Sequence, residues 1–324
     1  MNKEREKRIL VHGVLRRSAA GRALLLSSPR LQRVERCGCV ASRAPPLRDA
    51  SPLSRVLLFN LSLLDRVASF LEPRTRFVVR DGGGRLLPCL EYAPPRGGES
   101  VSTIVLWLHG AGARGAAHLD RLRLGGLPLW IDAARPHLRG PTRHLHPASP
   151  SFPFVVVAPQ CPEKTEWAAD ATLRALKALC LDARVRHGCA RIVAMGPSMG
   201  GLGAYMLAVK FPSLVAAIAP FCGGGKALYA RRLCGEAAGE GGGATGGAMP
   251  CWFWHADDDG VIACSSTIAI VDALRSGGND RVRFTRIAPG VVPTVWSAQW
   301  CRAHDVSAVA LGDAELWAWV ADPS

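Results

Sequence analysis

The chain has 324 residues, of which 48% are hydrophobic and 20% are charged. This balance is that of a globular protein and excludes an intrinsically disordered chain, which would be poor in apolar residues and rich in charge. No run of about 18 unbroken apolar residues is present, so we predict no membrane-spanning helix. The net charge of +14 leaves a nucleic-acid or membrane partner open until the charge is located.

Most of the positive charge lies at the beginning of the chain. Residues 1–48 contain 12 Lys and Arg and 3 Asp and Glu, which accounts for +9 of the +14. We predict that residues 1–74 are a basic, disordered leader with a short amphipathic segment at 54–71; a plastid or mitochondrial transit peptide is the alternative. Because the leader lacks a nucleic-acid-binding motif, we expect no nucleic-acid partner. Because no apolar run is long enough to span a membrane, we expect no stable membrane insertion and an intracellular, cytoplasmic protein.

Two sets of side chains that often bind metals give no metal-site pattern here. The eleven cysteines include no Cys-x-x-Cys pair, which favours reduced thiols in an intracellular protein. His144 and His146 lie in an irregular, proline-rich segment, 136–150, where spacing fixes no acidic or Cys partner for them. We therefore expect a solvated loop there.

The rest of the chain, residues 75–324, alternates between strand and helix patterns. A hairpin is predicted from strands at 75–80 and 86–91, joined by a glycine-rich turn. Continuous apolar runs are typical of strands buried on both faces of a parallel sheet, and they occur at 103–108, 154–158, 191–195, 216–219, 251–254 and 281–287. Helical patterns occur at 168–185, 199–210, 265–275 and 313–320. This alternation predicts an α/β domain with a mostly parallel sheet and antiparallel strands at one edge.

One short string carries the strongest functional signal. Residues 196–200 read Gly-x-Ser-x-Gly between a predicted buried strand and a predicted helix. A nucleophilic serine at a sharp strand-to-helix turn needs very small neighbours two residues before and after it. Gly196 and Gly200 supply these neighbours, so we predict a nucleophile elbow with Ser198 as the nucleophile.

An acyl-transfer serine also needs donors for the oxyanion. The first donor would be the backbone N–H of Met199, the residue after the nucleophile. The second comes from a loop after an earlier strand, and we nominate the backbone N–H of Ala111 in the small-residue stretch after 103–108.

The acid and the base are expected to follow in the order Ser, Asp, His. Asp257, Asp258 and Asp259 follow the predicted strand 251–254, and we choose Asp259 as the acid that orients the base. His304 is the only histidine after His255, so this order leaves it as the base. We expect His255, at the strand end, to be structural.

These residues together resemble the α/β-hydrolase superfamily over about residues 75–324. Within it the chain resembles esterase-like proteins often labelled predicted peptidases, which are related to dienelactone hydrolase, the phospholipase/carboxylesterase group and polyhydroxybutyrate-depolymerase-type esterases. The resembling strings are HGAGARG at 109–115, FPFVVVAPQCP at 152–162, GPSMGG at 196–201, FCGGG at 221–225, WHADDD at 254–259, HD at 304–305 and DAELWAW at 313–319.

The resemblance implies a three-layer fold with helices on both faces of the sheet, an antiparallel N-terminal hairpin and no large cap. It implies a triad of Ser198, Asp259 and His304, and no metal or organic cofactor. The chain departs from the family at Ala256, Ala303 and Ser307, and an insert of about a dozen residues at 291–302 precedes His304.

These observations predict a serine hydrolase that cleaves carboxylic esters through an acyl-enzyme. The glycine-rich segment 221–249 is short and irregular, which favours an open cleft for short or soluble acyl esters over a helical lid. A serine peptidase with the same triad, and a catalytically impaired hydrolase fold that binds a ligand or partner, remain the alternatives. The sequence gives no indication of the oligomeric state.

Overall fold

The computed structural model describes residues 76–94, 103–115, 119–133, 145–149, 151–235, 247–292 and 303–323. The predicted leader, His144, residues 236–246 of the glycine-rich segment and residues 293–302 of the insert lie outside these ranges. The predictions made for them remain predictions. In the part of the chain that the structure describes, no helix is long and apolar enough to cross a membrane.

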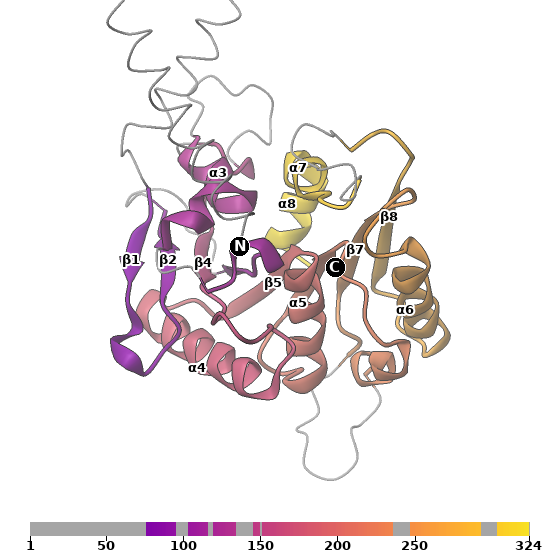
Figure 1. Ribbon diagram of the computed structural model, residues 1–324. Coiled ribbons are helices and arrows are strands. Elements are labelled where there is room, and N and C mark those ends of the chain that lie inside the picture. Colours follow the sequence, from indigo (N-terminus) through magenta and orange to yellow (C-terminus); the bar gives the residue numbers. More distant parts are fainter. Residues whose placement is uncertain are drawn as a thin grey trace, which may run out of the picture. The chain divides into compact units, whose positions relative to one another are not determined.

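Eight strands form one sheet in the order β1-β2-β4-β3-β5-β6-β7-β8 (Figure 1). Strands β1 and β2 pair antiparallel, as do β2 and β4, and all the other pairs are parallel. The prediction of a mostly parallel sheet with an antiparallel hairpin at one edge is therefore confirmed. The strands are β1 Val78–Arg80, β2 Cys89–Tyr92, β3 Thr103–Trp107, β4 Val155–Pro159, β5 Arg191–Pro197, β6 Ala217–Phe221, β7 Cys251–Ala256 and β8 Val282–Ile287.

Helices cover both faces of this sheet, which gives the three layers that the sequence predicts (Figure 1). One face carries the helices α4 Asp170–His187, α5 Met199–Lys210 and α6 Cys264–Ser276 together with the 3-10 helix η6 Ala227–Leu233. The other face carries α3 Gly126–Asp132, α7 Ser307–Gly312 and α8 Ala314–Ala321. Three further 3-10 helices are η2 Gly82–Gly84, η3 Ala111–Ala113 and η4 Leu119–Leu124.

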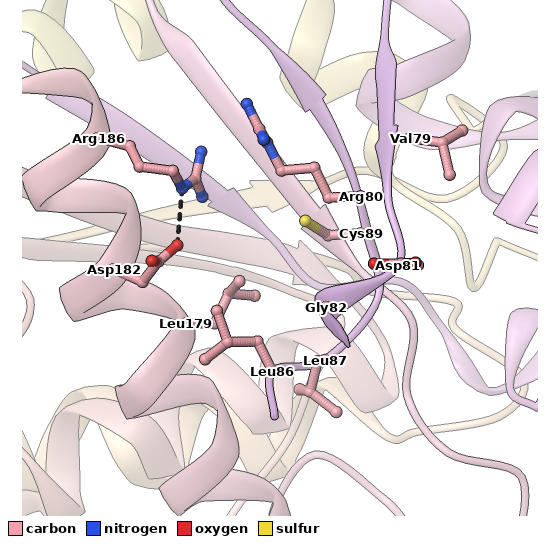
Figure 2. Close-up of a pocket in the computed structure, with 10 residues that line it drawn as sticks. All are labelled: Val79, Arg80, Asp81, Gly82, Leu86, Leu87, Cys89, Leu179, Asp182 and Arg186. Carbon is pink, nitrogen blue, oxygen red and sulfur yellow. Dashed lines mark hydrogen bonds and ion pairs between the residues drawn. The ribbon is translucent and has the colours of Figure 1, made fainter. Parts of the chain in front are cut away.

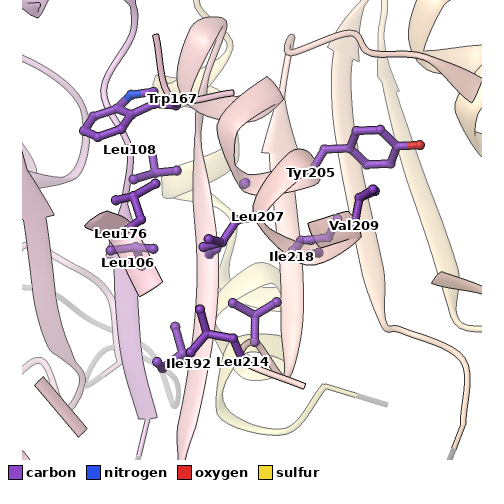
Figure 3. Close-up of a cluster of buried hydrophobic side chains, with 14 of the residues drawn as sticks. Leu106, Leu108, Trp167, Leu176, Ile192, Tyr205, Leu207, Val209, Leu214 and Ile218 are labelled. Carbon is purple, nitrogen blue, oxygen red and sulfur yellow. The ribbon is translucent and has the colours of Figure 1, made fainter. Parts of the chain in front are cut away.

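The two cores follow from the alternation of side chains along each strand. In β3, Ile104 and Leu106 point to the α4–α5–α6 face, while Val105 and Trp107 point to the opposite face. Every residue of β3 is buried, as the continuous apolar run requires. Figure 3 shows the first of these cores, with Leu207 of α5 lying over the strands among other buried aliphatic side chains. Burying one such side chain stabilises the fold by about 1.5–3 kcal/mol.

Two secondary-structure predictions are wrong for reasons visible in the structure. The second hairpin strand is Cys89–Tyr92, because Pro88 has no N–H to offer the strand ladder and the preceding residues form a 3-10 turn. Within the glycine-rich segment predicted to be irregular, Ala227–Leu233 is a 3-10 helix that buries Ala230 and Leu233 against the α6 side of the core.

Candidate active site

Ser198 lies at the sharp turn between β5 and α5. Its φ of 55° and ψ of −120° place a non-glycine residue in a rarely occupied backbone region. The turn is held by hydrogen bonds from Ser198 N–H to the Phe221 carbonyl at 2.8 Å and from Leu202 N–H to the Ser198 carbonyl at 3.0 Å. The half-buried Ser198 therefore sits at the carboxyl end of the central strand, immediately before the N-terminus of α5.

Only glycine fits at the two positions around Ser198, because the carbonyl oxygen of Leu108 lies next to both of them. A Cβ added at Gly196 or at Gly200 would collide with the backbone carbonyl oxygen of Leu108, directly after β3. Helix α5 and strand β5 thus approach the β3 end so closely that only hydrogen atoms fit at these two positions. The sequence pattern predicts that residues 196 and 200 must be small. The structure shows that the group they must leave room for is the carbonyl of Leu108, which the sequence did not identify.

The loop after β3 passes directly beside the nucleophile. A Cβ built on Gly110 would lie 3.8 Å from the Cβ of Ser198, and the next residue, Ala111, is exposed at the start of η3. Met199 begins α5 on the other side of Ser198. The structure thus brings the loop that contains Ala111 close to Ser198, and Met199 follows Ser198 directly in the chain.

A buried histidine fixes the geometry of this loop. Cys161 N–H donates to Nε2 of His109 at 3.1 Å, so Nε2 is the acceptor and Nδ1 carries the proton. His109 Nδ1–H then donates to the Gly110 carbonyl at 2.8 Å. Because C=O and N–H of a trans peptide point in opposite directions, this bond turns the Ala111 N–H away from the imidazole. Burial lowers the pKa of His109 to about 4, so its ring is neutral at pH 7.

Asp259 and His304 form the second half of the site. Nδ1 of His304 lies 2.8 Å from Oδ2 and 3.0 Å from Oδ1 of Asp259, so the imidazole donates its Nδ1 proton to the carboxylate. The other ring nitrogen, Nε2, is buried and has no hydrogen-bond partner among the residues that the structure describes. No hydrogen bond to Ser198 Oγ is formed in the same part of the chain. His304 thus presents an unused base nitrogen, as catalytic bases in unliganded enzymes often do.

The carboxylate of Asp259 is held by more than His304. Its Oδ1 accepts the backbone N–H groups of Val261 at 2.8 Å and Ile262 at 3.0 Å. Its Oδ2 lies 3.0 Å from Nε2 of His255. Burial alone would raise the pKa of this carboxyl, but the hydrogen bonds from both imidazoles and from the backbone outweigh it. They hold the pKa well below its ordinary value, and Asp259 is therefore an anion at neutral pH.

Cys222 is a neighbour that the sequence did not point to. Its thiol sulfur, a ring nitrogen of His304 and a carboxylate oxygen of Asp259 lie within 4.8 Å of one another, a set that can hold a metal ion. The Asp259 oxygens already accept the hydrogen bonds described above, and burial raises the pKa of the fully buried Cys222 thiol far above its ordinary value. These donors therefore fit a hydrogen-bonded acid–base pair better than a metal centre.

The remaining candidates take other roles. Asp257 pairs with Arg286 at 2.9 Å, and Asp258 accepts the Gly290 N–H at 3.2 Å, so both carboxylates brace the strand-end loops. His255 was expected to be only structural, yet it contacts Asp259 directly. The four-residue spacing between His255 and Asp259 was the only sequence signal for this contact. His146 accepts the Ala148 N–H through Nδ1 at 3.1 Å, within its own loop.

A separate cavity of about 580 Å³ lies between the β1–β2 hairpin and α4 (Figure 2). Arg80 and Arg186 reach into it, and both pair with the buried Glu91; Arg186 also bonds Asp182. Both guanidinium groups are thus paired with carboxylates of the protein. None of the predicted catalytic residues lines this cavity.

Comparisons with known proteins give the fold. No family model and no curated protein matches the chain. Among solved structures, a thermostable esterase matches with a TM-score of 0.57 and 23% identity, over 76% of this chain and 62% of that one. This chain thus spans less than two thirds of the length of that esterase. Esterase PE8 matches with a TM-score of 0.48 and 18% identity, over 74% of this chain and 100% of the other. The sheet order, the covering helices and the first of these likenesses agree, and the chain therefore has the α/β-hydrolase fold.

Proposed function

We propose that this protein is a serine hydrolase that cleaves carboxylic esters. One observation carries the proposal: His304 is bound through Nδ1 to the Asp259 anion, its Nε2 has no partner among the described residues, and its ring lies near Cys222, the residue that follows the hydrogen-bond partner of the strained Ser198. A base oriented in this way, next to a serine on a strand-to-helix turn, is the arrangement that activates a hydroxyl for attack on a carbonyl.

In the first half of the reaction, Ser198 Oγ attacks the acyl carbon of the ester and its proton passes to Nε2 of His304. The imidazolium that forms is stabilised by the Asp259 carboxylate. The negative charge that develops on the carbonyl oxygen is taken up by the N–H groups of Met199 and Ala111. Collapse of the tetrahedral intermediate breaks the C–O bond of the ester, and Nε2 returns its proton to the departing alcohol.

In the second half, water replaces the alcohol. Nε2 of His304 removes a proton from the water as it attacks the acyl carbon, and the same donors hold the oxyanion. When the intermediate collapses, Ser198 Oγ leaves with the proton from His304, and the carboxylic acid is released. In both halves the proton moves through His304, and the same backbone N–H groups hold the oxyanion.

The acyl groups that we propose are short or soluble. Residues 221–249 span 29 residues, of which seven form the 3-10 helix η6, too little chain for the large helical cap of a long-chain lipase. Ala111 is exposed and Ser198 is only half-buried, which supports direct access of small esters to the site.

The test compares p-nitrophenyl acetate, butyrate and palmitate with the p-nitroanilides of the same acyl groups. We expect the acetate and butyrate esters to be hydrolysed fastest, and Ser198→Ala to lower kcat by at least about 10³-fold. Faster cleavage of the anilides would favour a peptidase. A folded protein with no activity on either class would make this a ligand-binding hydrolase fold instead.

A further inference from the structure

His255 occupies a position behind the proposed acid. It lies in β7, four residues before Asp259, and is fully buried. Its Nε2 lies 3.0 Å from Oδ2 of Asp259 and 2.9 Å from the carbonyl oxygen of Ile262. Its Nδ1 lies 2.8 Å from Oγ1 of Thr267, which is itself buried on α6. Both ring nitrogens therefore have polar partners in a site without solvent.

These contacts determine the tautomer of the ring. Nε2 faces a carboxylate oxygen and a carbonyl oxygen, which only accept hydrogen bonds, so Nε2 carries a proton. In a neutral imidazole Nδ1 is then an acceptor, and the hydroxyl of Thr267 is the donor that satisfies it. In the opposite tautomer, the lone pair of Nε2 would face the oxygens of Asp259 and Ile262 and could accept no hydrogen bond from either.

The two oxygens of Asp259 are held in different ways. Oδ1 accepts two backbone N–H groups, which no side-chain substitution removes, and also lies 3.0 Å from Nδ1 of His304. Among the described residues, the partners of Oδ2 are the imidazoles of His255 and His304. The plane of the carboxylate, and with it the direction in which it holds His304, therefore depends on His255.

We propose that Thr267 and His255 are positioning residues for Asp259. The Thr267 hydroxyl holds His255 in the Nε2–H tautomer, and that N–H holds the carboxylate in the plane that binds Nδ1 of His304. This inference rests on the proposed function, because it assigns the two residues to the triad described above. The ionisable groups near Asp259 in the described part of the chain include His255, His304 and the thiols of Cys222 and Cys264.

The test is nuclear magnetic resonance on protein labelled with ¹⁵N in the histidine rings, with resonances of the triad assigned from His255→Gln and His304→Gln. In the wild type we expect His255 to be protonated at Nε2 and unprotonated at Nδ1. We expect a slowly exchanging Nδ1 proton on His304, which marks its bond to Asp259. The opposite tautomer of His255 in the folded wild type would overturn the proposal without any variant.

Three substitutions separate positioning from packing. Thr267→Val keeps the shape of the side chain and removes the hydroxyl, so the slow His304 proton should be lost and kcat should fall about tenfold with KM unchanged. Thr267→Ser restores the hydroxyl and should restore both. Thr172→Val removes a buried hydroxyl that contacts Thr165 at 3.2 Å, far from the triad in the chain, and should leave both unchanged.

The outcomes separate this proposal from the proposed function. The positioning role would be overturned if Thr267→Val keeps the slow His304 proton and has the same kcat as the Thr172→Val control, even if the enzyme hydrolyses esters. If the wild type hydrolyses no ester but the resonances respond as described, the positioning role stands and the proposed function fails.

Discussion

Two histidines share one carboxylate in this protein, and they differ in what their second ring nitrogen does. On His255 it accepts from Thr267, whereas on His304 it has no partner among the described residues. A histidine satisfied at both nitrogens holds its neighbours in place, and one with an unused nitrogen can move a proton. At the scale of the residue, this difference supports the proposed role of His304 as the base and the proposed positioning role of His255.

The charge of Asp259 can be tested with a change that preserves its size. Asp259→Asn should lower kcat by about 10⁴-fold, because an amide neither stabilises the imidazolium nor holds the Nδ1–H tautomer of His304. Steady-state ester hydrolysis measures the effect, with circular dichroism to confirm the fold. Asp258→Asn is the matched control and should change kcat only a few-fold; similar losses in both variants would contradict the choice of Asp259.

At the scale of the element, the turn from β5 into α5 depends on the space that the end of β3 leaves. Gly200→Ala places a methyl group against the Leu108 carbonyl, so the elbow must shift. We expect a loss of about 1–3 kcal/mol in the free energy of unfolding, measured in urea, and a marked fall in kcat. Gly312→Ala is the control, because its Cβ would meet only Trp130, at an ordinary 3.5 Å. Equal unfolding midpoints would contradict the steric account.

The elements that the sequence predicts well are those whose pattern is set locally. The continuous apolar runs predict inner strands such as β3 because both faces of these strands are buried, and the predicted helix over 199–210 has the bounds of α5. Helices α3 and α7 have only seven and six residues and were not predicted. Such short helices are stabilised by packing on the sheet rather than by their own sequence.

The site shows the same division. Chain order and the glycines around Ser198 predict a serine, an acid and a base, and the structure places Asp259 against His304. The contact of Thr267 with His255 depends on how α6 packs over β7, so no local pattern could predict it. The role of His109 depends likewise on Cys161, more than fifty residues later in the chain.

At the scale of the whole molecule, the buried His109 makes stability depend on pH. Its pKa is about 4 in the folded protein and near 6.5 when unfolded, so between these values the unfolded chain binds more protons. Stability should therefore fall as the pH drops from about 6.5 to 4, by up to about 3 kcal/mol from this group. Urea unfolding across this range should show a shallower slope for His109→Gln, and parallel slopes would contradict the assignment.

The net charge of +14 belongs mainly to residues 1–48, ahead of the described part of the chain. If the catalytic site is self-contained in residues 75–324, deletion of residues 1–48 should leave kcat and KM for short esters within about twofold of the full chain, since no triad member or oxyanion donor is removed. Ester hydrolysis by the two purified proteins measures this. A large rise in KM on deletion would show that the leader contributes to substrate binding.

The central claim is that Ser198 is a nucleophile activated by His304, and covalent labelling tests it most directly. The folded protein is incubated with a fluorophosphonate, and the modified residue is located by mass spectrometry of its peptides. We predict one adduct, on Ser198, formed rapidly in the wild type and much more slowly in His304→Ala. A folded wild type that takes up no label, or takes it up on another residue, would contradict the account.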